Sequence, residues 1–385
     1  MTVRVLADEN IPGLEQLLGP EADVRRCSGR RLRRADLDGA DALLVRSVTR
    51  VDGSLLAGTP VAFVGTATSG FDHVDRSWLE SADIGFAHAP GSNANAVVEY
   101  VLTAIAAIGD TLERLLEGAR VGIVGGGRVG TALARRLAAL GIDYCVYDPW
   151  LPEGEVAHAA DLSQVLRCDI VSLHCELTRE APWPSEHLID RAALGHIGTG
   201  SLLINTSRGP VVDNRALLQH LGERGGPGVV LDVWEGEPDI DPPLLDRVAL
   251  GTAHIAGYSL DGKWLASRMI CQALAGHFGF VPPEGTGATP GAPPAVAVPE
   301  GLSDAPLVRF LLRARYDILR DDALLRGAIA GAGRLEARER FDLLRRDYRQ
   351  RRELAASRVC GRLGPEARAL VHALGCEYSP ETLEP

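Results

Sequence analysis

The chain has 385 residues, of which 46% are hydrophobic and 24% charged, and its formal net charge is -11 at pH 7. This length is more than one small core can hold, so we expect two or three domains of a globular protein. The excess of acidic side chains argues against nucleic acid as the main partner, because phosphate binding requires a basic surface.

The first residues, MTVRVLADENIP, contain no apolar core of a signal peptide. The longest apolar run, near Ala96 to Ile108, is too short to span a bilayer. The seven cysteines form no C-x-x-C pair, which favours reduced thiols over a zinc site or a disulfide framework. We therefore expect a cytoplasmic protein with no bound metal and no membrane partner.

Short β-branched runs alternate with helical spacing over residues 1–94. Strands are expected at VRVLAD, ALLVRS, VAFVGTA and IGFAHAP, and a helical stretch contains Leu14, Leu17 and Leu18. Such alternation predicts a parallel sheet with crossover helices. A longer helix follows from about Asn95 to Gly109.

The strongest unit begins at Arg120, where the buried strand RVGIVGGG precedes a helix with leucines at helical spacing, and IDYCVYD forms the next strand. Gly125, Gly127 and Gly130 give this unit a G-x-G-x-x-G turn, which lets the helix N-terminus approach a diphosphate. Asp148 ends the following strand, where a carboxylate can accept hydrogen bonds from a ribose and would repel a 2′-phosphate. The unit therefore predicts NAD rather than NADP. A plain glycine turn in an α/β domain is the competing interpretation.

Four further strands are expected at DIVSLH, SLLINTS, GVVLDVW and VALGTAH, and ligands bind beyond the carboxyl ends of such strands. Arg208 follows one of these strands, and its planar guanidinium suits a substrate carboxylate. Asp232 ends the next strand, with Glu237 in the loop beyond it. His254 follows the last strand, and an imidazole exchanges protons near neutral pH. Taken singly, Arg208 would be a solvated charge, Glu237 a turn residue and His254 a structural histidine. Together they predict a histidine base that is oriented by a carboxylate.

A stretch rich in proline, glycine and alanine follows Val281 and has no periodicity, so we place a linker at 283–299. Beyond it, residues 300–385 contain helices rich in arginine and leucine, with a short strand at about Ser357 to Cys360. Acidic residues interleave with the arginines in these helices, which is typical of a solvated or intersubunit face and argues against RNA binding.

Four segments, in this order, resemble the D-isomer-specific 2-hydroxyacid dehydrogenase family: VGIVGGGRVG, INTSRGPVVDNRALLQHL, VVLDVWEGEP and GTAHIAGYS. The resemblance implies an α/β fold with two Rossmann-like, doubly wound parallel-sheet domains and a smaller α+β C-terminal dimerisation domain. The substrate-binding domain would be discontinuous, formed by residues 1–94 and 256–282. The NAD-binding domain would span 95–255, and the dimerisation domain 300–385.

The same resemblance implies a role for each candidate residue. Arg208 would bind the substrate and polarise it, Glu237 would orient His254, and His254 would transfer the proton. Asp232 would lie on the nicotinamide side. The implied NAD contacts are Gly125, Gly127, Arg128, Val129, Gly130, Asp148, Cys175, Thr206, Ser207, Arg208, Asp232 and Gly257.

The segments DENIP, VRSVTRVDGSLLAG, VGTATSGFDHVD and HIAGYSLDGK, with RYDILRDDALLR and FDLLRRDYRQRRE near the C-terminus, resemble one branch of that family. Its members oxidise 4-phosphoerythronate in vitamin B6 synthesis and form homodimers. The resemblance implies that Ser47, Thr68 and Tyr258 contact the substrate, and Arg46 would add a cation for this anionic molecule. An ordinary strand terminus is the alternative for Arg46 and Ser47. The chain departs from the branch at Cys175, where a threonine is usual and a thiol is the weaker donor.

Two other functions share these features. A 3-phosphoglycerate dehydrogenase or a glyoxylate/hydroxypyruvate reductase would have the same catalytic residues, and only the N-terminal motifs and the C-terminal region separate them. An NAD-sensing corepressor-like protein on the same fold would need the cofactor turn but no complete set of Arg208, Glu237 and His254. A small phosphorylated hydroxy acid remains the expected ligand.

Overall fold

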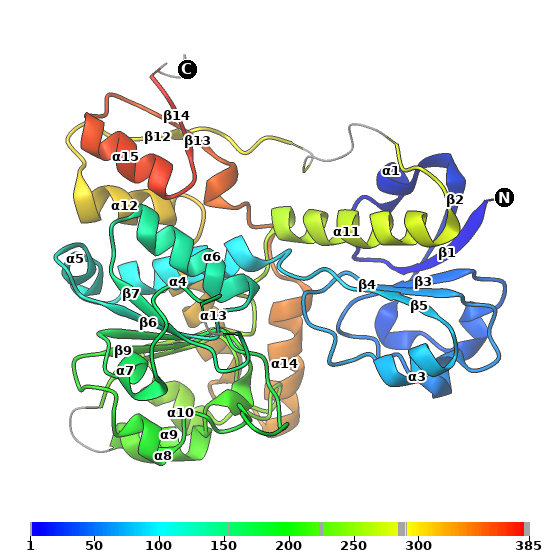
Figure 1. The fold of residues 1–385 in the computed structure, drawn as a ribbon, viewed down its shortest axis with the longest axis horizontal. Helices are drawn as coiled ribbons and strands as arrows, with labels where there is room; N and C mark the ends of the chain where they lie inside the picture. Colours follow the sequence, from blue (N-terminus) through cyan, green and yellow to red (C-terminus); the bar gives the residue numbers. More distant parts are fainter. Residues whose placement is uncertain (1, 153, 223–225, 284–288, 290, 381–385) are drawn as a thin grey trace. The chain divides into compact units, whose positions relative to one another are not determined.

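The computed structural model describes residues 2–152, 154–222, 226–283, 289 and 291–380 (Figure 1). Its contacts divide the chain into two compact units. Unit 1 comprises residues 1–93 and 259–292, and unit 2 comprises residues 94–258 and 293–385.

Unit 1 contains, among its described residues, a five-stranded parallel sheet in the order β2-β1-β3-β4-β5. Its strands and main helices, in chain order, are β1 (Val3–Asp8), α1 (Leu14–Leu18), β2 (Ala22–Cys27), β3 (Ala42–Val45), α2 (Gly53–Leu56), β4 (Phe63–Thr66), α3 (Arg76–Ser81), β5 (Gly85–Ala87) and α11 (Leu260–Phe278). This agrees with the alternation of strands and helices in the sequence.

Both faces of this sheet are covered by helices (Figure 1). On one face, Leu14 of α1 and Ile270 of α11 pack with Val5 of β1. On the other face, Leu56 of α2 and Leu79 of α3 form a second core. The unit is therefore doubly wound, because each strand sends alternate side chains to opposite faces.

Unit 2 is built on a six-stranded parallel sheet, counted over the residues the structure describes, in the order β11-β10-β9-β8-β6-β7. Its elements up to residue 251 are α4 (Ala94–Ala107), α5 (Thr111–Leu116), β6 (Val121–Val124), α6 (Arg128–Ala139), β7 (Tyr144–Tyr147), α7 (Leu162–Leu166), β8 (Ile170–Leu173), α8 (Arg191–Leu194), β9 (Leu202–Asn205), α9 (Asn214–Gly222), β10 (Gly228–Leu231), α10 (Pro242–Arg247) and β11 (Leu250–Gly251). The strands at its centre are wholly buried, as their continuous apolar runs predict.

The register of these strands brings the candidate site residues to one edge. Val124 at the end of β6 pairs with Tyr147 of β7 and with Leu173 of β8. Leu231 at the end of β10 pairs with Asn205 of β9 and Gly251 of β11. The residues that follow these strands therefore leave the sheet at its carboxyl edge, where ligands bind in such folds.

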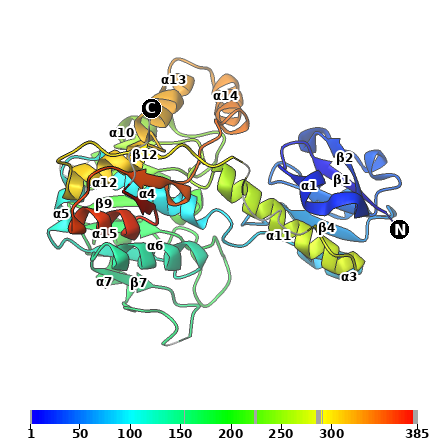
Figure 2. The same ribbon diagram turned by 90° about the horizontal axis from the view of Figure 1, so that it is seen from above.

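The C-terminal region contains β12 (Val296–Ala297), α12 (Asp304–Arg313), α13 (Ile318–Ile329), α14 (Arg334–Arg346), β13 (Arg358–Cys360), α15 (Pro365–Ala373) and β14 (Glu377–Ser379). The three strands form a small parallel sheet in the order β12-β13-β14 (Figures 1 and 2). The strand expected near Ser357 to Cys360 is thus present as β13.

The structure differs from the expected organisation at the linker. Residues 284–288 and 290 of that segment lie outside the described residues, and its end forms strand β12. Residues 293–385 cluster with residues 94–258 in unit 2 instead of forming a third compact unit. The physical reason is a shared core: Leu307 and Leu311 of α12 pack with Ile105 of α4, while Phe341 of α14 joins the core on the opposite face of the sheet.

Candidate active site

The first and last glycines of the glycine turn pack against backbone atoms, whereas the middle one faces open space. Gly125 follows β6 with φ of 99°, and a Cβ added there would lie 2.4 Å from the backbone nitrogen of Cys175. A Cβ on Gly130, in the first turn of α6, would lie 1.9 Å from the carbonyl oxygen of Gly125. Gly127 caps α6, and nothing lies within 4 Å of its Cβ position. The open space at Gly127 is what a diphosphate at the helix N-terminus requires.

A cavity of about 430 Å³ lies beside this turn, at the carboxyl ends of β6, β7 and β8. Asp148 stands in its wall, with Oδ2 accepting from the Gly126 N–H at 2.8 Å and Oδ1 from the Trp150 N–H at 3.0 Å. These bonds fix the carboxylate, whose remaining lone pairs can accept from ribose hydroxyls. Trp150 and Trp183 add apolar walls, with the Trp150 indole N–H donating to the Trp183 carbonyl at 3.1 Å. The lining therefore fits an adenosine diphosphate group.

Other residues expected to contact NAD lie around the same edge. Cys175 lines the cavity, and burial raises the pKa of its thiol to about 12, so it remains protonated at neutral pH. The Thr206 hydroxyl donates to the Leu173 carbonyl at 3.4 Å. The Ser207 hydroxyl donates to Asn205 Oδ1 at 2.9 Å. Arg128 and Val129 begin α6, and Gly257 lies in the same loop as His254, between β11 and α11.

Asp232 is buried and its carboxylate holds the loop after β11. Its Oδ1 accepts from the Thr252 hydroxyl at 2.6 Å and from the Ile255 N–H at 2.7 Å, and its Oδ2 accepts from the Ala256 N–H at 3.0 Å. The Tyr100 hydroxyl of α4 lies 2.7 Å from that of Thr252 and extends the network. Asp232 thus positions the His254 loop, a role that its sequence position did not indicate. Its expected contact with nicotinamide stays a prediction.

His254 and Glu237 form a carboxylate–imidazole pair. Nδ1 of His254 is hydrogen-bonded to Oε1 of Glu237, and Oε2 of Glu237 accepts from the Trp234 N–H at 3.1 Å. Burial raises the pKa of Glu237, but the neighbouring His254 and Arg345 outweigh it and the pKa is lowered overall. Glu237 is therefore an anion that fixes Nδ1, which leaves Nε2 of His254 for proton transfer.

Arg208 lies on the loop after β9. At Gly209, the next residue, this loop packs against the loop that carries Glu237. A Cβ on Gly209 would lie 2.1 Å from the carbonyl oxygen of Trp234 and 2.5 Å from the backbone nitrogen of Glu235, so only glycine allows this approach. One guanidinium nitrogen of Arg208 donates to the Ser207 carbonyl at 2.9 Å. The structure thus brings the Arg208 and Glu237 loops into backbone contact.

The expected substrate residues fall in both units. In unit 1, Ser47 is exposed just after β3, whereas Arg46 is ion-paired through Nε with the buried Asp8 at 2.9 Å. The Thr68 hydroxyl donates to the Gly70 carbonyl at 2.7 Å. In unit 2, Tyr258 is half-buried in the segment that follows His254. Their contacts with a substrate remain predictions.

Sequence reasoning did not single out Arg345 of α14. Its guanidinium lies within hydrogen-bonding reach of the Tyr258 hydroxyl and its charge acts on Glu237. Tyr348 lies nearby, with its ring edge-on to that of Tyr258 at 5.8 Å between centroids. The alternating charges of this helix are typical of a solvated or intersubunit face, and such a pattern does not show which arginine a neighbouring loop will cover.

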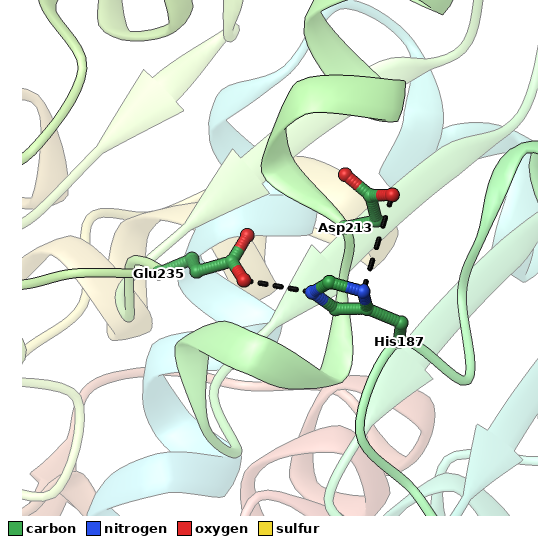
Figure 3. Close-up of side chains that lie close together, drawn as sticks. All are labelled: His187, Asp213 and Glu235. Carbon is green, nitrogen blue, oxygen red and sulfur yellow. Dashed lines mark hydrogen bonds and ion pairs between the residues drawn. The ribbon is translucent and has the colours of Figure 1, made fainter.

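Figure 3 shows a second imidazole between two carboxylates, formed by His187, Asp213 and Glu235. Nε2 of His187 lies 2.7 Å from Glu235, and Nδ1 lies 4.0 Å from Asp213. The hydrogen bond to Glu235 raises the pKa of His187. Since each ring nitrogen faces a different carboxylate, the group fits a protonated histidine that joins two loops.

Comparison with known proteins identifies the family. Residues 105–256 match the D-isomer specific 2-hydroxyacid dehydrogenase, NAD binding domain. The erythronate-4-phosphate dehydrogenase of Marinobacter nauticus is 45% identical over 92% of this chain and 94% of its own length. That of Cellvibrio japonicus is 43% identical over 97% of this chain and 98% of its own length. The chain belongs to the erythronate-4-phosphate dehydrogenase family.

Solved structures agree with this family assignment in fold. A D-lactate dehydrogenase from Aquifex aeolicus, complexed with NAD and lactic acid, superposes with a TM-score of 0.58 at 24% identity, covering 71% of this chain and 96% of that one. An NAD-bound 3-phosphoglycerate dehydrogenase from Entamoeba histolytica gives 0.61 at 20% identity, covering 72% and 96%. NAD is the cofactor of this family's dehydrogenase domain, and the glycine turn and its cavity fit it.

The C-terminal region has a match of its own. Residues 294–375 match a family described as a domain of unknown function, DUF3410. In the part of the chain that the structure describes, no helix is long and apolar enough to cross a membrane.

Proposed function

We propose that this protein oxidises 4-phosphoerythronate to 2-oxo-3-hydroxy-4-phosphobutanoate with NAD, a reaction of pyridoxal phosphate synthesis. Its support is the match to erythronate-4-phosphate dehydrogenases over more than nine-tenths of the chain. The observation that carries the chemistry is the Glu237–His254 pair, on the same sheet edge as the dinucleotide turn.

In this proposal each side chain has one task. Nε2 of His254 takes the proton of the substrate hydroxyl, and Glu237 stabilises the imidazolium that forms. The Arg208 guanidinium binds the substrate carboxylate. Bound NAD accepts the hydride from the carbon that carries the hydroxyl. Asp148 favours NAD over NADP because its charge opposes a 2′-phosphate.

A substrate panel tests the proposal. The purified protein is assayed with 4-phosphoerythronate, 3-phosphoglycerate and glycerate, with NAD or NADP, and with 2-oxoglutarate added to regenerate NAD. We expect turnover of 4-phosphoerythronate with NAD. Turnover of 3-phosphoglycerate without any of 4-phosphoerythronate would overturn the assigned substrate and favour the related dehydrogenase.

The same assay separates an enzyme from a binding protein. A His254→Ala variant of the proposed enzyme should lose turnover and still bind NAD, because His254 does not form the glycine turn or its cavity. An NAD-sensing corepressor would show no turnover in the wild-type protein either.

We further propose a cytoplasmic homodimer that forms through α13 and α14. The support is a set of leucines on these helices that are exposed to solvent: Leu319 (47%), Leu324 (47%), Leu335 (74%) and Leu343 (39%). Helices α13 and α14 pack against each other, and a contact between subunits would cover these leucines. Light scattering after gel filtration should give a dimer for the wild-type protein and a monomer for Leu324→Glu with Leu335→Glu; a monomeric wild type would refute it.

A further inference from the structure

The C-terminal region places a cation at the candidate active site. Arg345 lies near the end of α14, in the part of the chain that matches a domain of unknown function. Burial lowers the pKa of this guanidinium, but the neighbouring Tyr258 and Glu237 outweigh it and the pKa is raised. Arg345 therefore stays charged beside the residue that orients His254.

Its hydrogen-bonding capacity is only partly used. The Nε of Arg345 is buried and has no hydrogen-bond partner in the protein. A guanidinium has five N–H donors, and a buried donor left unpaired costs free energy. The neighbouring acceptors do not fill this need: Glu237 already binds His254 and Trp234, and neither the Tyr258 hydroxyl nor the Asp342 carboxylate, whose charge also acts on Arg345, pairs with Nε. An acceptor that arrives with a ligand would satisfy this donor.

We propose that Arg345 binds the phosphate group of the substrate; this rests on the proposed function. In 4-phosphoerythronate the phosphate lies only a short carbon chain away from the reacting hydroxyl, so its binding group must lie close to His254. Phosphate oxygens are strong acceptors, and the guanidinium fork can bind two of them at once. Arg208 is assigned to the carboxylate at the other end, and Arg46 is already paired with Asp8. The C-terminal region thus supplies substrate specificity.

The alternative is that Arg345 acts only on Glu237, holding it as an anion. The two roles differ in what they predict for a substrate without phosphate. Loss of a phosphate contact affects only the phosphorylated substrate, whereas loss of a group that positions Glu237 affects proton transfer with every substrate.

The test measures kcat/KM of the full-length protein with 4-phosphoerythronate and with erythronate, for wild type, Arg345→Ala and Arg345→Lys. A matched control is Arg346→Ala, on the same helix, whose guanidinium pairs with Asp347 in solvent. For Arg345→Ala we expect kcat/KM for 4-phosphoerythronate to fall roughly 10- to 100-fold, the range for a charge-assisted hydrogen bond. The value for erythronate should change little, and Arg345→Lys should recover part of the loss.

Inhibition by inorganic phosphate gives a second measurement that does not require turnover of erythronate. Phosphate should compete with 4-phosphoerythronate in the wild type and in Arg346→Ala, and more weakly in Arg345→Ala. Equal losses with both substrates, or unchanged phosphate inhibition, would overturn the proposal. So would a phosphate-selective loss in Arg349→Ala alone, since Arg349 also has unpaired buried nitrogens. A wild type inactive with 4-phosphoerythronate would refute the proposed function instead.

Discussion

Two carboxylate–imidazole pairs lie on loops at the edge of the unit 2 sheet, and their residues show how environment decides a role. Glu237 and His254 are 21% and 29% exposed, and Glu237 is fixed by the Trp234 N–H. Glu235 and His187 are 34% and 43% exposed, and there the pKa of His187 is raised by the hydrogen bond. The first pair leaves Nε2 of His254 available for the proton transfer that we propose, while the second uses both ring nitrogens of His187 to join loops.

These pairs give a matched prediction. Glu237→Gln should lower kcat by about 10²- to 10⁴-fold, because the imidazolium loses its stabilising anion. Glu235→Gln should change kcat by no more than about twofold, since it removes a largely solvated ion pair. Steady-state kinetics with a calorimetric check of NAD affinity measures both. Similar kcat values for the two variants would contradict the assigned roles.

At the scale of elements, the β6–α6 turn combines two requirements that fall on different glycines. Gly130 is needed for the fold, because its Cβ position lies 1.9 Å from a carbonyl oxygen. Gly127 leaves open space at the N-terminus of α6, where we propose that the diphosphate binds. Helix α4 contacts the C-terminal region through a buried carboxylate: Glu99 accepts from the Leu354 and Ala355 N–H groups at 2.8 and 3.0 Å.

The two glycines can be separated by alanine substitutions. Gly130→Ala should lower the free energy of unfolding by about 1–3 kcal/mol, the cost of overpacking a close contact. Gly127→Ala should leave that free energy nearly unchanged and weaken NAD binding by at least about tenfold. Urea denaturation and titration calorimetry measure these effects. Unchanged NAD affinity in Gly127→Ala would mean that the diphosphate lies elsewhere.

Glu99 predicts a pH dependence. Burial first, and then the nearby Glu353, raise the pKa of Glu99 from its ordinary value of 4.5 to about 7. The folded chain therefore holds a proton that the unfolded chain releases in this window, so stability falls as pH rises from 4.5 to 7. Glu99→Gln should flatten that fall in denaturation experiments.

The control for this experiment is Glu113→Gln. Arg309 lowers the pKa of Glu113, so its titration lies below the ordinary value of 4.5. The stability that the Glu113–Arg309 pair gives the folded chain is therefore lost only as pH falls below 4.5. A Glu99→Gln variant that keeps the wild-type slope between pH 4.5 and 7 would contradict the assignment.

At the scale of the whole molecule, the C-terminal region is part of unit 2. Its helices contribute to both cores of the dehydrogenase sheet, through Leu311 on one side and Phe341 on the other. Polar contacts add to this: Asp322 accepts from the Gly251 N–H at 2.8 Å, and Arg309 pairs with Glu113 at 2.9 Å. An independently folded domain would have its own core, whereas the C-terminal helices complete the two cores of the unit 2 sheet.

Truncation tests this arrangement. A chain ending at residue 282 should expose the apolar side of α4, including Ile105, and lose the cooperative unfolding of the full chain. We expect aggregation on gel filtration and binding of a hydrophobic dye. A monodisperse truncated protein with wild-type NAD affinity would show that the C-terminal region is dispensable for folding.

The sequence by itself determined the strand–glycine turn–helix unit and the strand ends on which the candidate catalytic residues lie. Gly125, Gly127, Gly130 and Asp148 are near one another in the chain, and strand ends of a parallel sheet share an edge, so local patterns suffice there. The two doubly wound sheets follow from the same alternation of strands and helices.

Only the tertiary structure decided the role of residues whose partners are distant in the chain. The pattern around Arg345 is that of a solvated or intersubunit helix face. The position of Arg345 beside Glu237 depends on how α14 packs in the core through Phe341. Asp232 likewise holds the loop of His254 through contacts that no spacing predicts. Helical periodicity shows which face is apolar, but packing determines what covers it.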